Sequence, residues 1–272
     1  MTNHAPSASS RKALLGLAVV AAVVALAAAT GFLEPYSLLI TLGGSLAVVR
    51  ATFSQPRVGA AARAVRSVLT AGERPEEAEL EALIGRFKSF ARIYRVEGAQ
   101  ALDRAANVES DEFLRLAAER AIDGTTPEEV REVLSGEASR LLTERSEARA
   151  VVATLGRLLP AFGLIGTLIG LALMLRSLSS LDPAALGPGL AISVMTTLYG
   201  AVFANVVVLP IATKLSDDLE RRRRAMELTI VGAELLNRRE LPTRIERALR
   251  SRARLRALEE PNGLVLLTER AA

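Results

Sequence analysis

The chain has 272 residues, of which 50% are hydrophobic and 24% charged, and its formal net charge is +4. It has no cysteine and a single histidine, His4, so disulfides and thiolate metal sites are excluded and a zinc site or His-based catalytic triad is not expected. Apolar and charged residues occur in separate blocks, which is typical of a chain that crosses a bilayer. Because the arginine excess flanks the apolar runs, we interpret it as a determinant of membrane orientation and expect no nucleic acid partner.

Four uncharged apolar runs follow one another along the chain. The first extends from Ala13 to Leu33, long enough at about 1.5 Å per residue to cross about 30 Å of hydrocarbon. Lys12 precedes it, and we interpret the run as a retained helix, with a cleaved signal peptide as the alternative. The second run, Pro35 to Val49, is shorter. The third covers Leu158 to Leu175 and the fourth Gly187 to Thr213.

These runs predict an all-α integral membrane protein with four transmembrane helices. The expected parts are an N-terminal tail (1–12), a first transmembrane hairpin (13–53), a helical domain (54–157), a second transmembrane hairpin (158–213), and C-terminal helices and tail (214–272). Lys and Arg gather beside the tail, the helical domain and the C-terminal part, whereas the two short loops hold only Glu34, Arg176 and Asp182 as charged residues. The positive-inside rule therefore predicts a multi-pass protein with both termini and residues 54–157 in the cytoplasm.

The cytoplasmic segments are predicted to be helical. Apolar spacing indicates helices over 76–105, 111–142, 214–238 and 242–256, and Thr126 is a candidate N-cap. The stretch from Val58 to Leu69 is amphipathic, and we expect it to lie on the inner membrane surface. The segments contain no spaced metal ligands and no phosphate-binding glycine loop, so we expect no metal, no cofactor and no enzymatic activity.

The apolar runs contain no Asp, Glu, Lys, Arg or His. Proton paths through membranes normally use an ionisable side chain, so a partner subunit would have to supply it. Hydroxyl groups at helical spacing are the candidate ion pathway: Thr167, Ser193, Thr196 and Thr197. Small residues on the same two helices predict close packing: Gly163, Gly166, Gly170 and Gly200. Packing alone is an alternative explanation of both stripes.

Two prolines lie near the cytoplasmic ends of the last two runs. Pro160 lies at the start of the third run and Pro210 near the end of the fourth. Proline removes one helical hydrogen bond and bends the helix. We expect these residues to act as paired hinges, with a static kink as the alternative.

The segment from Pro160 to Gly170, together with Leu186–Asn205 and Leu209–Leu215, resembles the MotA/PomA branch of the MotA/TolQ/ExbB proton channel superfamily. The residues Ile40-Thr-Leu-Gly-Gly-Ser45 are similar to the second helix of that branch. The two spans at the N-terminus favour this branch, because TolQ and ExbB have three spans in all.

The resemblance implies an ion-conducting stator subunit of the bacterial inner membrane. Five such subunits would surround two copies of a MotB-like single-span partner whose membrane Asp binds the translocated H⁺ or Na⁺. The cytoplasmic loop would push on a FliG-like rotor protein through Arg95 and Asp103, although Asp103 stands where the family usually has Glu. Thr167, Thr196 and Thr197 match the polar channel positions of the family, and Pro160 and Pro210 match its paired prolines.

Two other functions remain open at this point. The same kind of ion-driven subunit could energise gliding or outer-membrane processes in the manner of ExbB or TolQ, which the Asp at position 103 motivates. The glycine stripes could alternatively belong to a passive scaffold. The sequence favours neither H⁺ nor Na⁺ on chemical grounds, since hydroxyl groups suit both.

Overall fold

The computed structural model describes residues 34–70, 76–123, 126–177 and 186–259, and this part of the chain contains helices and no strand. The predicted tail 1–12, the first apolar run 13–33 and residues 260–272 lie outside the described residues. The chain divides into two compact units. The first unit comprises residues 1–73 and 144–218, and the second comprises residues 74–143 and 219–272.

The described part of the first unit begins with four helical segments, namely α2 (Pro35–Leu38), the π-helical segment η1 (Leu39–Gly43), α3 (Gly44–Thr52) and α4 (Gln55–Thr70). Pro35 occupies the first turn of α2, where its missing N–H costs no hydrogen bond. The Glu34 carboxylate caps this helix by accepting a 2.6 Å hydrogen bond from the Ser37 backbone N–H. The helix start predicted at Pro35 is therefore present.

Part of the apolar face of α4 is covered by protein. Ala61 is 4% exposed, and Val58, Val65 and Val68 pack against the same cluster of side chains from α8 and α10. Arg57, at the start of α4, forms a 2.7 Å ion pair with Glu147. We predicted that this face would lie on the membrane surface. The structure packs part of it on the helices of its own unit and leaves Leu69 57% exposed, so contact with the membrane surface stays a prediction.

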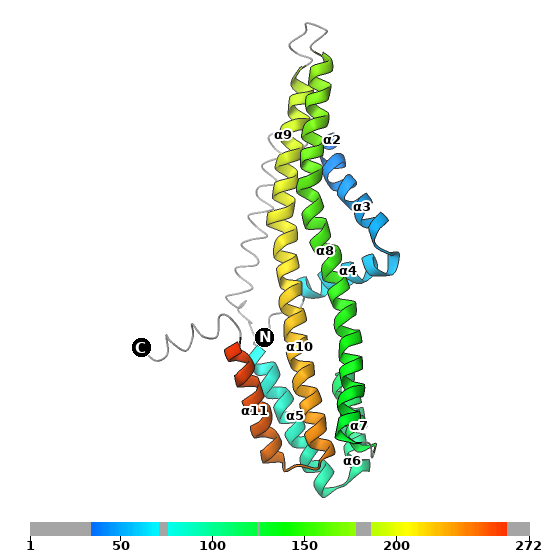
Figure 1. Ribbon diagram of the computed structural model, residues 1–272, viewed down its shortest axis with the longest axis vertical. Coiled ribbons are helices and arrows are strands. Elements are labelled where there is room, and N and C mark those ends of the chain that lie inside the picture. The colour runs from blue at the N-terminus through cyan, green and yellow to red at the C-terminus, as the bar shows by residue number, and fades with distance from the viewer. Residues whose placement is uncertain (1–33, 71–75, 124–125, 178–185, 260–272) are drawn as a thin grey trace, which may run out of the picture. The chain divides into compact units, whose positions relative to one another are not determined.

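Two long helical stretches follow. The first is α8 (Pro127–Ser177), and the second consists of α9 (Leu186–Val202), the π-helical segment η4 (Phe203–Val208) and α10 (Leu209–Asn237) (Figure 1). Each is long and apolar enough to cross a membrane, and they contain the runs predicted at 158–175 and 187–213. Residues 144–177 of α8 and 209–218 of α10 belong to the first unit. No helix ends at residue 157, where the expected domain boundary lies.

The second unit contains α5 (Glu76–Val96), α6 (Ala99–Asn107), α7 (Glu112–Ile122), α11 (Pro242–Glu259) and the adjoining parts of α8 and α10. The single helix predicted over 76–105 is wrong, because the chain turns at Gly98. That residue has a φ of 85°, which side chains disfavour and glycine adopts freely. The predicted N-cap Thr126 is confirmed, since its hydroxyl accepts from Glu129 N–H and Glu129 accepts from Thr126 N–H.

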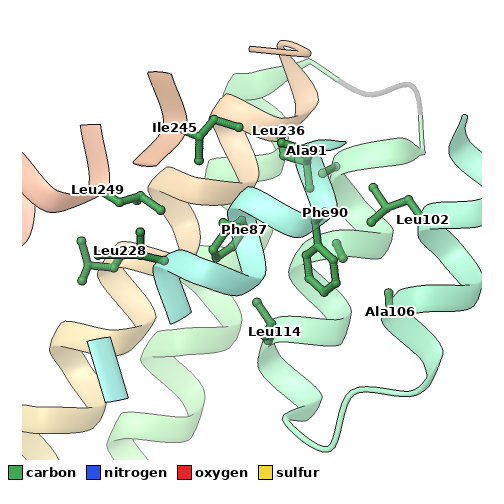
Figure 2. Close-up of a cluster of buried hydrophobic side chains, with 13 residues drawn as sticks. Phe87, Phe90, Ala91, Leu102, Ala106, Leu114, Leu228, Leu236, Ile245 and Leu249 are labelled. Atoms are coloured by element: carbon green, nitrogen blue, oxygen red, sulfur yellow. The ribbon is translucent and has the colours of Figure 1, made fainter. Parts of the chain in front are cut away.

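The core of the second unit forms around Phe87 and Phe90 of α5, whose rings meet edge to face at 6.2 Å. Figure 2 shows Leu102, Leu114 and Leu236 gathered around them from three other helices. Burial of each such side chain contributes about 1.5–3 kcal/mol. The apolar faces predicted for the segments after Glu76 and Asp111 are confirmed. This packing ties α11 and the end of α10 to α5.

Candidate functional site

The predicted pathway hydroxyls meet where α8 packs against α9. Thr167 Oγ1 of α8 lies 3.1 Å from the Ser193 carbonyl of α9, and Ser193 Oγ lies 3.1 Å from the Thr167 carbonyl. Thr197, one turn further along α9, has its Oγ1 within hydrogen-bonding distance of Thr167 Oγ1. Ser193 is buried, Thr167 is half-buried and Thr197 is exposed. We call Thr167 and Thr197 the hydroxyl pair.

The hydroxyl pair has spare capacity to bind a ligand. Thr167 Oγ1 has three oxygen neighbours, the carbonyls of Gly163 and Ser193 and the Thr197 hydroxyl, but only one proton to donate. Thr197 Oγ1 likewise has one proton and lies 3.4 Å from the Ser193 carbonyl. Lone pairs on Thr197 therefore remain available on the exposed side. They could accept a hydrogen bond from a protonated carboxyl or coordinate a cation.

Thr196 faces the interior of the first unit. Its side chain is fully buried, and its hydroxyl donates to the carbonyl of Ile192 in the preceding turn. Its own carbonyl accepts a 3.4 Å hydrogen bond from Thr41 Oγ1. A methyl group added at Gly166 would lie 2.4 Å from the Thr196 side chain. Thr196 is thus part of the packing between α9, α8 and η1, and the structure does not bring its hydroxyl into the exposed pair.

A second row of hydroxyls was missed by the sequence interpretation. Ser37, Thr41 and Ser45 are all fully buried on the short helices after Glu34. Ser37 Oγ donates to the Ile192 carbonyl at 3.5 Å, and Ser45 Oγ donates to the Thr41 carbonyl at 2.6 Å. Their spacing of four residues within an apolar run was the available signal, because it places all three on one helix face.

The glycines allow this close packing. A methyl group at Gly200 would lie 2.6 Å from the Leu159 carbonyl oxygen, and one at Gly163 would lie 3.0 Å from the Thr196 carbonyl oxygen. One at Gly170 would lie 2.4 Å from Ser193 Oγ. The backbones of α8 and α9 therefore touch at the predicted glycine positions, which is the usual arrangement of small residues between membrane helices.

The two prolines have different surroundings. Pro160 lies inside α8 and lines a pocket of about 610 Å³ between α8 and the η4–α10 stretch, together with Arg157, Asn205 and Val208. Pro210 is the second residue of α10 and lies two residues after the end of η4. A proline lacks the N–H that would bond to the carbonyl four residues earlier, and a π-helical turn is one way to accommodate the loss. The Pro160 ring therefore borders the open space of this pocket.

The candidate rotor-contact residues lie on the second unit. Arg95 is in the last turn of α5, and its guanidinium donates a 3.1 Å hydrogen bond to the Arg239 carbonyl. Asp103 is on α6, where its carboxylate accepts a 3.3 Å hydrogen bond from the Asn107 side chain. Arg95 and Asp103 form no hydrogen bond or ion pair with each other. Arg239 was missed by the sequence interpretation, because a contact between residues 144 positions apart leaves no local pattern.

Comparison with known proteins identifies the class. The sequence pattern of the MotA/TolQ/ExbB proton channel family matches residues 105–228. The chain is 32% identical to the chemotaxis protein PomA of Vibrio alginolyticus over 74% of this chain and 77% of PomA. It is 31% identical to motility protein A of Aquifex aeolicus over 78% and 82% of the two chains. It is 35% identical to the uncharacterized protein YtxD of Bacillus subtilis over 75% and 74%.

Solved structures agree on the fold. The chain superposes on a chain of the C. jejuni MotAB structure with a TM-score of 0.75 at 21% identity, covering 88% of this chain and 94% of that chain. The flagellar MotAB stator complex of Bacillus subtilis gives a TM-score of 0.73 at 24% identity, covering 87% and 93%. The part of the chain that the structure describes is therefore all-helical and has the fold of these solved chains. The chain belongs to the MotA/TolQ/ExbB proton channel family and to its MotA/PomA branch.

Proposed function

We propose that this chain is the ion-conducting A subunit of a stator that works with a MotB-like partner and couples inward H⁺ or Na⁺ flow to torque on the flagellar rotor. The observation that carries the proposal is the hydroxyl pair. Its Thr197 hydroxyl is exposed on a helix hairpin whose apolar runs contain no ionisable side chain, so the pair offers oxygen ligands but no proton-binding group. A carboxylate brought by a partner would complete the site.

The partner would be a single-span helix whose membrane Asp faces Thr167 and Thr197. In its protonated form the Asp would donate to Thr197 Oγ1, and in its charged form it would accept from the two hydroxyls. Hydrogen bonds to the charged form favour ionisation, so the pair would help to set the affinity of the Asp for the ion. Close packing at Gly163, Gly166, Gly170 and Gly200 would keep the two hydroxyls at a fixed spacing.

The assembly would be a ring of five of these subunits around two copies of the partner in the bacterial inner membrane. Each subunit would cross the membrane four times, with both termini and the second unit in the cytoplasm. Exposed apolar side chains on α8 and α9, such as Leu164, Leu168 and Leu198, support contacts with lipid and with neighbouring helices. Hinges at Pro160 and Pro210 would let ion binding bend the hairpin. We assign the subunit no enzymatic step.

The rotor contact would involve a FliG-like protein and the charges at Arg95 and Asp103. Arg95 is exposed, which supports a contact of this kind. The alternative task, energising gliding or outer-membrane processes, is favoured by the shorter acid at position 103. Deletion of the gene separates the two: loss of swimming supports the flagellar rotor, and intact swimming with an envelope defect supports the alternative.

Ion flux measured in cells with a fluorescent pH or Na⁺ indicator tests the channel itself. We expect no flux when the chain is expressed alone and a measurable flux when it is coexpressed with its single-span partner. The ion that carries the flux follows from the same assay when pH and Na⁺ gradients are imposed separately. Flux through the chain alone would contradict the shared channel.

The variant Pro160→Leu distinguishes the proposed channel subunit from a passive scaffold. We expect this variant to insert and assemble normally but to lose ion-driven function, because the hinge is removed. Pro188→Leu is the matched control, since Pro188 lies in the first turn of α9 where a proline removes no hydrogen bond. Unchanged function in Pro160→Leu would favour the scaffold.

A further inference from the structure

We propose that Arg239, Arg95 and the ring of Tyr94 form one cationic docking site that binds carboxylates on the rotating partner. The site, called here the arginine site, deepens the proposed function and rests on it. It joins the end of α5 to the turn between α10 and α11, both within the second unit. The resemblance to the family pointed only to Arg95.

The backbone at Arg239 gives the first reason. The turn after α10 has the two hydrogen bonds of a Schellman motif, from Arg239 N–H to the Leu236 carbonyl at 2.9 Å and from Glu240 N–H to the Leu235 carbonyl at 3.1 Å. Arg239 occupies the left-handed position of this motif with a φ of 53°, where glycine is the favoured residue. A side chain at such a position opposes local stability. A functional role for the guanidinium explains its presence.

The side chain of Arg239 is held in place. Its Nε lies 3.3 Å from the Tyr94 hydroxyl, and its guanidinium carbon lies 4.9 Å from the centre of the Tyr94 ring. Stacking of this kind fixes the plane of a guanidinium while leaving its edge open. Arg95 binds the Arg239 carbonyl at 3.1 Å, so the second guanidinium is tied to the same turn. The two cations are therefore positioned before any partner arrives.

The charges around the arginine site are unbalanced. Arg95 and Arg239 form no ion pair with any carboxylate in the part of the chain that the structure describes. Nearby acids are engaged elsewhere: Glu240 pairs with Arg244 at 3.2 Å, and Glu128 pairs with Arg238 at 3.6 Å. Glu97 is exposed and follows Arg95 by two residues, so its negative charge reduces the positive potential on the Glu97 side of the arginine site. A guanidinium edge fits a carboxylate through two parallel hydrogen bonds.

The composition of the surface favours a protein as the occupant. Val96, beside Arg95, is 78% exposed, which places an apolar side chain next to two arginines and a tyrosine. Arginine and tyrosine are among the residues that contribute most to protein interfaces. The partner surface would thus present acidic side chains beside an apolar one.

Substitutions in the chromosomal gene of the source bacterium test the site through swimming speed and motor torque. We expect Arg239→Gly and Arg239→Glu to reduce both by about half or more, with Arg239→Lys less affected. Glycine is the favoured residue at this backbone position, so a loss in Arg239→Gly cannot come from backbone strain, and an unchanged melting temperature shows that the fold is kept. Arg252→Glu is the control, because Arg252 is exposed on α11 and has no role in the arginine site. Motile revertants of Arg239→Glu should carry acid-to-base changes in the rotor protein.

Several outcomes would overturn the arginine site. Arg239→Gly and Arg95→Ala are compared as single variants of the same parent strain. Normal swimming of Arg239→Gly together with poor swimming of Arg95→Ala would exclude Arg239 from the rotor contact and leave the proposed function standing. A changed complex size on native gels, or loss of copurifying anionic lipid, in Arg239→Glu would reassign the surface to a subunit or lipid contact. Normal swimming after deletion of the whole gene would instead refute the flagellar function, and with it a rotor contact at this site.

Discussion

Thr167 of α8 and Ser193 of α9 contact each other twice. The hydroxyl oxygen of each residue lies 3.1 Å from the carbonyl oxygen of the other. The Ser193 hydroxyl is therefore engaged in a hydrogen bond inside the protein. This arrangement leaves Thr197, which contacts Thr167 through its own hydroxyl, as the member of the group that faces outward. The division of roles among three similar residues leads to the first prediction.

Thr197→Val should reduce ion flux through the coexpressed complex by about tenfold, which corresponds to the loss of one hydrogen bond worth about 1.4 kcal/mol. Valine keeps the β-branched shape, so the helix is preserved. Thr197→Ser should retain most of the flux. Thr213→Val is a matched control, because that hydroxyl bonds to the Leu209 carbonyl of its own helix. Equal flux in Thr197→Val and the parent protein would exclude Thr197 from the pathway.

Gly200→Ala should destabilise the hairpin by about 1–3 kcal/mol, since the added methyl group would force the two backbones apart. The contact is with the Leu159 carbonyl oxygen, which cannot move without α8. Gly187→Ala is the control, because no described atom lies within 4 Å of the added methyl group. Thermal unfolding of the detergent-solubilised protein measures both. Similar melting temperatures would show that the close approach at Gly200 is not required.

Arg131→Met should lower the free energy of unfolding by about 1–3 kcal/mol, because it leaves the Glu234 carboxylate without its partner. Glu234 is 8% exposed, and Arg131 contacts both of its carboxylate oxygens. The same ion pair raises the pKa of Arg131 above its ordinary value. Denaturant unfolding followed by circular dichroism provides the measurement.

Two further variants separate the cause of this loss. Adding Glu234→Gln to Arg131→Met should restore part of the stability, since the double variant buries no unpaired charge. Arg115→Met should have little effect, because Arg115 and Glu119 form an exposed pair within one helix. A double variant no more stable than Arg131→Met would argue that packing, and not the charge, explains the loss.

The docking of α11 on α5 should weaken in acid. Lys88 of α5 pairs with Glu246 of α11 at 2.6 Å and, with Arg250, holds the pKa of Glu246 below its ordinary value of 4.5. A lowered pKa in the folded state means that the stabilisation is present above pH 4.5 and is lost as the pH falls through the folded-state pKa. Lys88→Met should reduce this dependence. Hydrogen exchange of the α11 amides between pH 5 and about 3 measures the weakening of this docking. An equal acid response in the parent protein and in Lys88→Met would show that the Lys88–Glu246 pair does not cause it.

The amino-acid order by itself determined much of the secondary structure and the chemistry of the hairpin. The sequence alone shows uncharged runs that are long enough to cross a bilayer. It also shows that these runs contain no ionisable group. The spacing of Gly163, Gly166 and Gly170 predicts a close contact, because residues three and four apart share a helix face. The helix break at Gly98 was missed, because whether glycine adopts a positive φ depends on the packing around it.

Only the tertiary structure decided which residues of each face meet a neighbour. Helical periodicity sets the angle of Thr196 and Thr197 around α9, but it does not say which side is covered by η1 and which is left open. The structure buries Thr196 and exposes Thr197. It also brings Arg239 to Arg95 and Tyr94, far away in the chain, because the core around Phe87 and Phe90 packs α5 against α11 and the end of α10. Contacts of that kind depend on how whole helices pack, which no local pattern encodes.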